Sequence, residues 1–132
     1  MTESNNETYG DALTRPFWEA ARQHKLLIQY CPDSDRYQFY PRPFDLATGS
    51  ENVEWVEAKG TGVVHSMTTV HLKVSNLLEP PYVVALVELD EGVRMTTNII
   101  GGECEIGDRV ELTWFERDDG LPPLPMFRPV QQ

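Results

Sequence analysis

Residues 30–50 have the outline of a small metal-binding ribbon that lacks most of its metal ligands. The stretch YCPDSDRYQFYPRPFDLATGS opens with Cys31-Pro32, which predicts a tight turn, and continues into a short aromatic strand. A second turn-like stretch runs from Asp45 to Gly49. Structural zinc is normally held by four cysteine or histidine ligands, whereas this stretch has a single cysteine. The chemistry it suggests is structural zinc binding in a degenerate form.

Catalytic motifs are absent from the sequence. His65, Ser66 and several aspartates could form a nucleophile, base and acid on paper, but no G-x-S-x-G elbow places a serine on a strained turn. There is no Walker phosphate loop, and the Gly101-Gly102 pair opens no helix, so the dinucleotide fingerprint is missing too. His65 and His71 fall in a predicted strand and most carboxylates fall in turns, where solvation accounts for them. We therefore predict no catalytic residue and no enzyme that is active alone.

Cysteine usage and hydropathy indicate a cytoplasmic protein. The two cysteines, Cys31 and Cys104, do not form a disulfide framework and are expected to be free thiols in a reducing compartment. No stretch approaches the roughly 18 apolar residues of a membrane helix. The first residues are acidic and polar, unlike a signal peptide, and residues 1–14 are expected to form a flexible arm.

Charge is unevenly distributed along the chain. The net charge is −10, made up of −3 over residues 1–14, +2 over residues 15–42 (five basic against three acidic residues) and −9 over residues 43–132 (six against fifteen). So negative a chain repels phosphate backbones, and we expect no nucleic-acid partner. Only the segment before residue 43 is suited to face an anion.

The predicted elements are one short helix followed by strands. Thr14 is a plausible N-cap, Pro16 fits the first turn, and good helix formers continue to His24. Short strands with Gly-rich turns between them favour a small closed barrel. The strands are predicted from alternation and β-branched content at residues 25–30, 36–40, 53–58, 63–74, 82–89, 93–100 and 109–116, and a last short segment follows at residues 125–130.

Three stretches, taken in order, resemble a known family. They are PFWEAARQHKLLIQYC, then YPRPFDLATGSENVEWVEAKGTGVVHSMTTVH, then PPYVVALVELDEGVRMTTNIIGGECEIGDRVELTWFERDDGLPPLPMFRPV. They resemble the acyl-CoA-associated OB-fold family with an N-terminal rubredoxin-like zinc ribbon, domain of unknown function thirty-five (DUF35), over about residues 15–130. The expected fold is mainly β: an N-terminal helix and ribbon-like hairpin over residues 15–52, then a five- to six-stranded OB-fold barrel with a Pro-rich tail over residues 53–132.

The resemblance implies a subunit of a larger acyl-CoA enzyme. Family members are partner subunits of thiolase-like enzymes, including ketoacyl-CoA thiolases and retro-aldolases of steroid side-chain breakdown. The expected function is a non-catalytic or active-site-completing subunit, in an α2β2 or larger heteromer whose thiolase-fold partner forms or cleaves a carbon–carbon bond. Acyl-CoA would be a ligand of the complex, with no tightly bound cofactor. The alternatives are an accessory subunit of a MaoC-like enoyl-CoA hydratase, an OB-fold nucleic-acid binder, or an independent CoA-binding or thioesterase-like protein.

The resemblance also places the metal ligands of the family ribbon. Its two C-x-x-C knuckles fall on Cys31, Ser34, Asp45 and Thr48, so that three of the four thiolates are missing. We expect no zinc, with His24 or a nearby aspartate as the alternative donor. The hypothesis is that an aromatic mini-core, or packing against a partner, replaces the metal. The aromatic residues in question are Tyr30, Tyr37, Phe39, Tyr40 and Phe44.

A docking surface is expected in residues 15–44. This segment is dense in aromatic residues and in arginines suited to carboxylate or phosphate groups. The alternative is that the aromatic residues fill a core and the arginines are ordinary surface charges. The residues predicted to face CoA or a partner are Arg15, Phe17, Trp18, Arg22, Phe39, Tyr40, Arg42 and Phe44.

Overall fold

The structure, a computed structural model, describes residues 10–130 of the 132-residue chain as two compact units. Of these residues, one unit takes 10–59 and 116–124, and the other takes 60–115 and 125–130. The arm predicted over residues 1–14 lies mostly outside the described residues. Its last part, residues 10–14, contains a turn in which the Thr14 hydroxyl donates to Asp11 Oδ1 at 2.9 Å.

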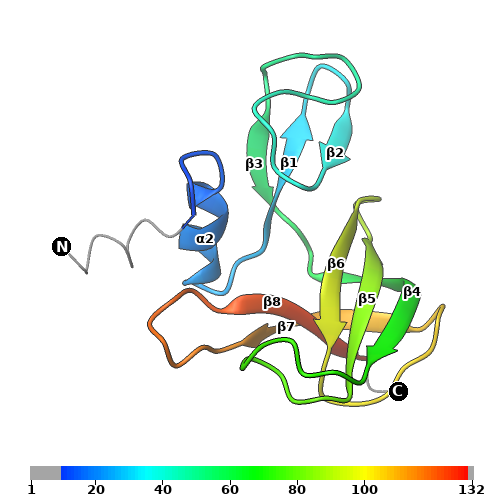
Figure 1. Ribbon diagram of the computed structural model, residues 1–132. Coiled ribbons are helices and arrows are strands. Elements are labelled where there is room, and N and C mark those ends of the chain that lie inside the picture. The colour runs from blue at the N-terminus through cyan, green and yellow to red at the C-terminus, as the bar shows by residue number, and fades with distance from the viewer. Residues whose placement is uncertain (1–9, 131–132) are drawn as a thin grey trace. The chain divides into compact units, whose positions relative to one another are not determined.

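The first unit consists of a helix and a three-stranded antiparallel sheet (Figure 1). The strand order is β2-β1-β3, and β1 pairs with both neighbours through Gln29↔Gln38 and Gln29↔Trp55. The predicted helix and ribbon are thus present. The elements are α2 (Arg15–Ala21), β1 (Leu27–Cys31), β2 (Arg36–Gln38) and β3 (Glu54–Glu57).

The third strand corrects the expected domain boundary. We assigned residues 53–58 to the barrel, whereas β3 pairs with β1 and completes the ribbon sheet. The observed division falls after Lys59 rather than after residue 52, and the loop over residues 116–124 also belongs to the first unit. Strand propensity does not say which sheet a strand will join, and this is why the sequence misplaced it.

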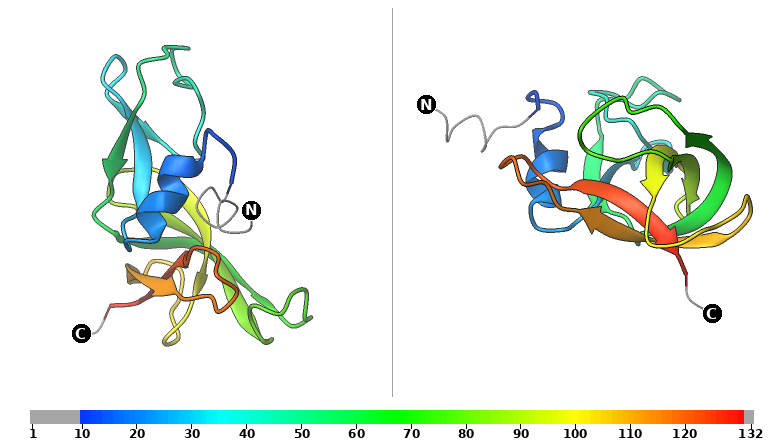
Figure 2. Two further views of the ribbon diagram at one scale, coloured as in Figure 1. Left: turned by 90° about the vertical axis from the view of Figure 1, so that its left-hand side faces the viewer. Right: turned by 60° about the horizontal axis from the view of Figure 1, so that its bottom comes forward.

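The helix is shorter than predicted because the chain turns sharply after it. Thr14 is the N-cap, as expected, and a proline lies in the first turn. The helix ends at Ala21, and His24 takes a left-handed conformation with φ of 60°. The Lys25 N–H then donates to Ala20 O at 3.0 Å, which closes the helix end. The α2 helix buries Phe17 and Ala21 and lies beside β1 (Figure 2, left).

The second unit is the five-stranded closed barrel of the OB fold, in the order β4-β5-β6-β8-β7 (Figure 2, right). Its pairings are antiparallel between β4 and β5, β5 and β6, and β4 and β7. The barrel closes through a parallel bridge, Ile99↔Phe127. The strands are β4 (Thr61–Val70), β5 (Tyr82–Leu89), β6 (Arg94–Ile99), β7 (Arg109–Phe115) and β8 (Leu124–Pro129).

The barrel interior is filled by residues that alternate along the strands. Ala85, Val87 and Leu89 are buried along β5, at the period of two that a half-buried strand requires. Phe127 is fully buried, so the Pro-rich C-terminal segment supplies a barrel strand. Within the described residues, no helix is long and apolar enough to cross a membrane.

Candidate functional site

A row of four aromatic rings links the helix to the ribbon. The Phe17 ring packs edge-on against Trp18 at a centroid distance of 4.8 Å and against Phe39 at 5.7 Å, and Phe39 contacts Tyr40 at 4.9 Å. The row passes from Phe17, which is only 6% exposed, to Tyr40, which is 56% exposed. The structure therefore brings together four of the eight predicted docking residues.

Tyr40 is one of four large apolar or aromatic residues of the ribbon that are exposed. Tyr37, Tyr40, Phe44 and Leu46 are 40–60% exposed, and we call these four residues the ribbon surface. The expected aromatic mini-core is wrong, because Tyr37, Tyr40 and Phe44 are exposed rather than inside it, while the alternative of packing against a partner stays a prediction. Sequence reasoning also missed Leu46, which follows the buried Asp45 with no periodic signal.

The three predicted arginines are exposed, and one of them bonds a backbone carbonyl group. Arg15 and Arg42 have exposed side chains. Arg22 donates from Nη2 to the carbonyl oxygen of Gly120 at 3.3 Å, within the same unit. Arg22 thus contacts the loop over residues 116–124 of its own unit.

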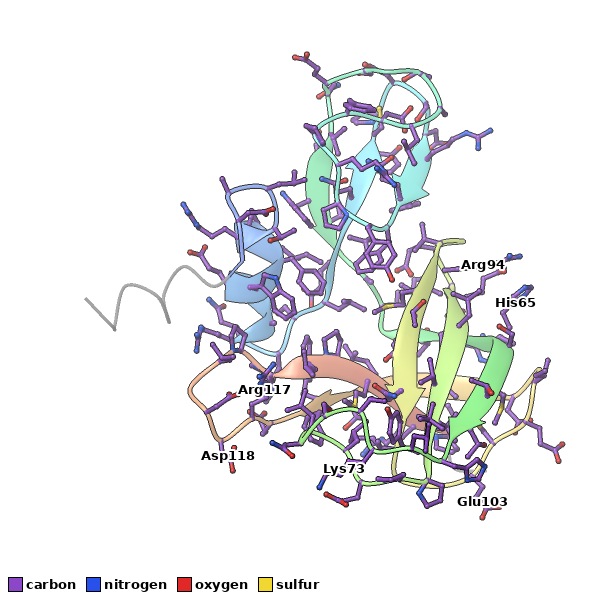
Figure 3. All side chains as sticks on the ribbon, in the orientation of Figure 1. His65, Lys73, Arg94, Glu103, Arg117 and Asp118 are labelled. Carbon is purple, nitrogen blue, oxygen red and sulfur yellow. The ribbon has the colours of Figure 1, made fainter. Side chains whose placement is uncertain are left out.

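That loop also holds two ion pairs. His24 Nε2 lies 2.5 Å from Glu116 Oε2, so His24 faces this loop rather than a metal site. Arg117, whose side chain is 13% exposed, binds Asp119 at 2.6 Å, and its hydrogen bonds lower the pKa of the Asp119 carboxyl. Asp118 points outward from the loop (Figure 3). The loop is organised around its own charges.

Of the four predicted metal positions, Asp45 and Thr48 are hydrogen-bonded to each other. The Asp45 side chain is 2% exposed, and its Oδ2 accepts from Thr48 Oγ1 at 2.8 Å and from Thr48 N at 3.0 Å. These bonds, led by that of the Thr48 hydroxyl, lower the pKa of the Asp45 carboxyl, with a further contribution from Ser34. The Ser34 hydroxyl is buried and has no partner of full hydrogen-bond geometry. Cys31 is buried at 2% exposure.

These residues do not fit a structural zinc ion. Tetrahedral zinc requires four thiolate, imidazole or carboxylate ligands, and the four positions offer one thiol and one carboxylate. Oδ2 of that carboxylate already accepts two hydrogen bonds from Thr48. Within residues 10–130, no group of three or more His, Cys, Asp or Glu side chains is placed to hold a metal.

The ribbon instead contains a pair of glutamines that sequence reasoning missed. Gln29, 3% exposed, accepts at Oε1 from Gln38 Nε2 and from Arg42 N, both at 2.8 Å. Gln29 Nε2 donates to Arg42 O at 2.9 Å. The available signal was a glutamine within the otherwise apolar strand LLIQYC, where a buried polar side chain requires partners.

The barrel histidines do not form a catalytic set. His65 is the extra residue of a β-bulge between Val64 and Ser66, and its exposed side chain points away from the barrel (Figure 3). His71 is exposed in the segment that follows β4. Bulges re-aim side chains, and this one directs an imidazole to solvent.

Comparison with known proteins identifies relatives of both units. Residues 55–115 match the family model described as "ChsH2, C-terminal OB-fold domain". Residues 18–44 match the model described as "ChsH2, rubredoxin-like zinc ribbon domain", a match that stops just before Asp45.

Solved structures that resemble this chain include the following two. One, described as "Ltp2-ChsH2(DUF35) aldolase", is 41% identical with a TM-score of 0.82 and covers 92% of this chain and 97% of that chain. The other, a DUF35 protein of unknown function from Sulfolobus solfataricus, is 18% identical with a TM-score of 0.61 and covers 83% of this chain and 84% of that one. At that identity the second structure supports the fold alone.

Two curated relatives are hydratase subunits. A probable enoyl-CoA hydratase alpha subunit of Thermomonospora curvata is 45% identical over 118 residues, which is 86% of this chain and 37% of the relative. A 3-oxo-4,17-pregnadiene-20-carboxyl-CoA hydratase alpha subunit of Mycobacterium tuberculosis is 32% identical over 120 residues, which is 83% of this chain and 38% of the relative. The chain thus spans less than two-fifths of either protein.

Proposed function

The chain belongs to the ChsH2-type DUF35 family, and from that premise we propose that it is a small subunit of a heteromeric acyl-CoA enzyme with a thiolase-fold partner. The partner would form or cleave a carbon–carbon bond in an acyl-CoA, as a thiolase or a retro-aldolase. The observation that carries the proposal is the 41% identity to the Ltp2-ChsH2(DUF35) aldolase, over 97% of that chain.

The side chains available for acid–base chemistry favour a non-catalytic role for this chain. His24, His65 and His71, the residues most suited to general base catalysis, are all exposed, and His24 is engaged by Glu116. We infer that the reacting groups belong to the partner and that this subunit is not active alone. Acyl-CoA is then a ligand of the assembled enzyme.

The ribbon surface is the proposed docking face. Aromatic and arginine side chains are enriched at protein interfaces, and Tyr37, Tyr40 and Phe44 are exposed. Among the residues predicted from sequence, Arg15, Trp18, Arg22, Phe39 and Arg42 remain proposed contacts. Phe17, at 6% exposure, supports its neighbours from within.

The second candidate is an accessory role in a MaoC-like enoyl-CoA hydratase. The two hydratase alpha subunits at 45% and 32% identity favour it, because this chain matches part of each. Nucleic acid is the weakest candidate partner, since residues 43–132 carry a net charge of −9. A cytoplasmic location stays a prediction.

The test is reconstitution of the full chain with each candidate partner. We would coexpress it with an Ltp2-type thiolase-fold protein and, separately, with a MaoC-like hydratase, and determine complex mass by light scattering. A stable complex with the first, and retro-aldol cleavage of a β-hydroxyacyl-CoA only when both chains are present, would support the proposal. A complex with the hydratase alone would replace it by the second candidate.

A matched pair of variants locates the interface. Tyr40→Ala with Phe44→Ala removes two side chains of the ribbon surface. Leu72→Ala with Val74→Ala removes two side chains, 76% and 71% exposed, after β4 of the barrel unit. We expect the first pair to weaken the complex tenfold or more (about 1.4 kcal/mol) and the second to leave it unchanged. The reverse pattern would move the docking face to the barrel.

A further inference from the structure

We propose that the ribbon of this chain folds without metal, and that a network of side-chain hydrogen bonds takes the structural place of zinc. The network consists of three parts: a glutamine clamp, an aspartate-capped turn, and a bridge between the two turns of the ribbon. Each part joins segments that a zinc ion would otherwise hold together through its ligands. The inference is independent of the function proposed above.

The glutamine clamp fixes the segment that leads to the second turn. Gln29 and Gln38 are direct partners across β1 and β2. Gln29 bonds both backbone groups of Arg42, accepting from N at 2.8 Å and donating to O at 2.9 Å. Gln38 donates to Phe44 O at 3.0 Å and accepts from Leu46 N at 3.1 Å. Four side chain–backbone bonds thus hold residues 42–46 against the strand pair.

The buried Gln29 side chain of the clamp is hydrogen-bonded at both its oxygen and its nitrogen. The Gln29 Oε1 atom accepts two bonds and its Nε2 donates one, at 3% exposure. A buried amide stabilises a fold only when its donors and acceptors are paired. The Gln29 side chain makes three such bonds, two with the backbone of Arg42 and one with the side chain of Gln38.

The second turn is closed around Asp45 instead of a metal. Asp45 N donates to Ser50 O, and Gly49 N donates to Asp45 O, both at 2.7 Å. The Asp45 carboxylate accepts from the backbone and the hydroxyl of Thr48. Gly49 has a φ of 76°, a conformation that suits glycine. The two positions that correspond to the second pair of family ligands, 45 and 48, thus bond each other.

The bridge connects this turn to the first one. Ser50 Oγ donates to Asp33 Oδ2 at 2.6 Å, and Ser50 Oγ in turn accepts from Asn52 N at 3.1 Å. The first turn is closed by the Asp35 N–H, which donates to Cys31 O at 2.8 Å. Cys31 contributes this carbonyl and a buried thiol, which packs as a small apolar group. The two turns are therefore joined through Asp33 and Ser50, with no thiolate involved.

The first experiment measures metal content and metal dependence in the full-length chain. The protein is purified from zinc-supplemented medium without chelator, its zinc is quantified by inductively coupled plasma mass spectrometry, and its thermal midpoint is recorded with and without 1,10-phenanthroline. We expect far less than stoichiometric zinc and an unchanged midpoint. Stoichiometric zinc, or a midpoint lowered by the chelator, would overturn the proposal.

The second experiment tests the network itself by amide hydrogen exchange. Gln29→Met removes the glutamine clamp and Asp45→Asn removes the negative charge of the acceptor at the second turn, both at nearly constant volume, and Gln23→Met and Asp118→Asn are matched changes at exposed positions. We expect protection to fall about tenfold or more at the amides of Arg42, Leu46, Thr48 and Gly49 in the first pair only. Unchanged protection in both network variants would overturn the proposal. If either fails to fold, the wild-type zinc and chelator measurements still decide it.

Discussion

Phe17 of the helix and Phe39 of the ribbon lie with their ring centroids 5.7 Å apart, in a row of rings that ends at the exposed Tyr40. Phe17 lies within this row, buried between Trp18 and Phe39, and Tyr40 is its exposed end. The same short run of aromatic residues thus contributes to two different tasks, internal packing and a surface that is open to a partner.

Substituting alanine for Phe17 and for Tyr40 should change the free energy of unfolding by different amounts. Phe17→Ala removes a buried ring and should lower the free energy of unfolding by about 3–5 kcal/mol. Tyr40→Ala removes a ring that is 56% exposed and should cost less than about 1 kcal/mol. Urea denaturation followed by circular dichroism measures both. Equal losses would mean that Tyr40 is part of the core after all.

The glutamine clamp predicts an unusually large effect for a polar substitution. Gln29→Met keeps the side-chain volume but leaves the part-buried backbone N–H and C=O groups of Arg42 without their partner. The free energy of unfolding should fall by about 1–3 kcal/mol. Gln23→Met, at an exposed position, should change it by less than about 0.5 kcal/mol. If the two variants are equally stable in urea, the clamp contributes nothing.

Most of the fold was predictable because it depends on local pattern. All seven predicted strands are present, the short segment after them forms β8, and Thr14 occupies the N-cap position as expected. The assignment of β3 to the ribbon was not predictable, since it depends on pairing with β1. The alternation of apolar and polar residues, together with turn residues, predicts where strands lie in the sequence. Which strands pair depends on packing between distant segments.

The candidate site was predicted less well, for a related reason. The sequence located Cys31, Ser34, Asp45 and Thr48 through the family resemblance, but it suggested an aromatic replacement for zinc. The interactions at these positions are polar and centre on Asp45, and they are the replacement that we propose. From sequence alone, a glutamine or aspartate is expected at the surface. Only the structure shows whether its side chain is buried and hydrogen-bonded or solvated.

Restoring the missing thiolates should restore metal binding. Ser34→Cys, Asp45→Cys and Thr48→Cys, combined with the native Cys31, provide the four-cysteine set of a structural zinc site. The triple variant should bind near-stoichiometric zinc, and its thermal midpoint should fall on addition of a chelator. The single variant Ser34→Cys, with two thiols in the ribbon, is the control and should bind none tightly. A triple variant that binds no zinc would show that the four positions do not converge.

Tyr30 provides a pH-dependent signature of the ribbon. Its hydroxyl donates to Asp35 Oδ1 at 2.6 Å, and this hydrogen bond raises the pKa of Tyr30 from 10.0 to about 12. Because the folded pKa lies above the unfolded one, the stabilisation is fully present below pH 10 and is lost as the pH rises towards 12. Ultraviolet titration of the five tyrosines should show one late ionisation. That step should vanish in Tyr30→Phe and move to lower pH in Asp35→Ala; a late step that survives Tyr30→Phe would assign it elsewhere.

The barrel should be intolerant of a methyl group at Gly62. A Cβ there would lie 2.5 Å from Glu88 O and 3.0 Å from Val87 Cγ1 on the paired strand β5, so that backbone would have to move. Gly62→Ala should therefore lower the free energy of unfolding by about 1–3 kcal/mol. Thr68→Ala, at an exposed position on the same strand, is the control and should change it by about 0.5 kcal/mol or less. Since Gly62 lies in the barrel unit, exchange protection of the ribbon amides at residues 42–49 should be unaffected. A loss of protection there would show that the two units unfold together.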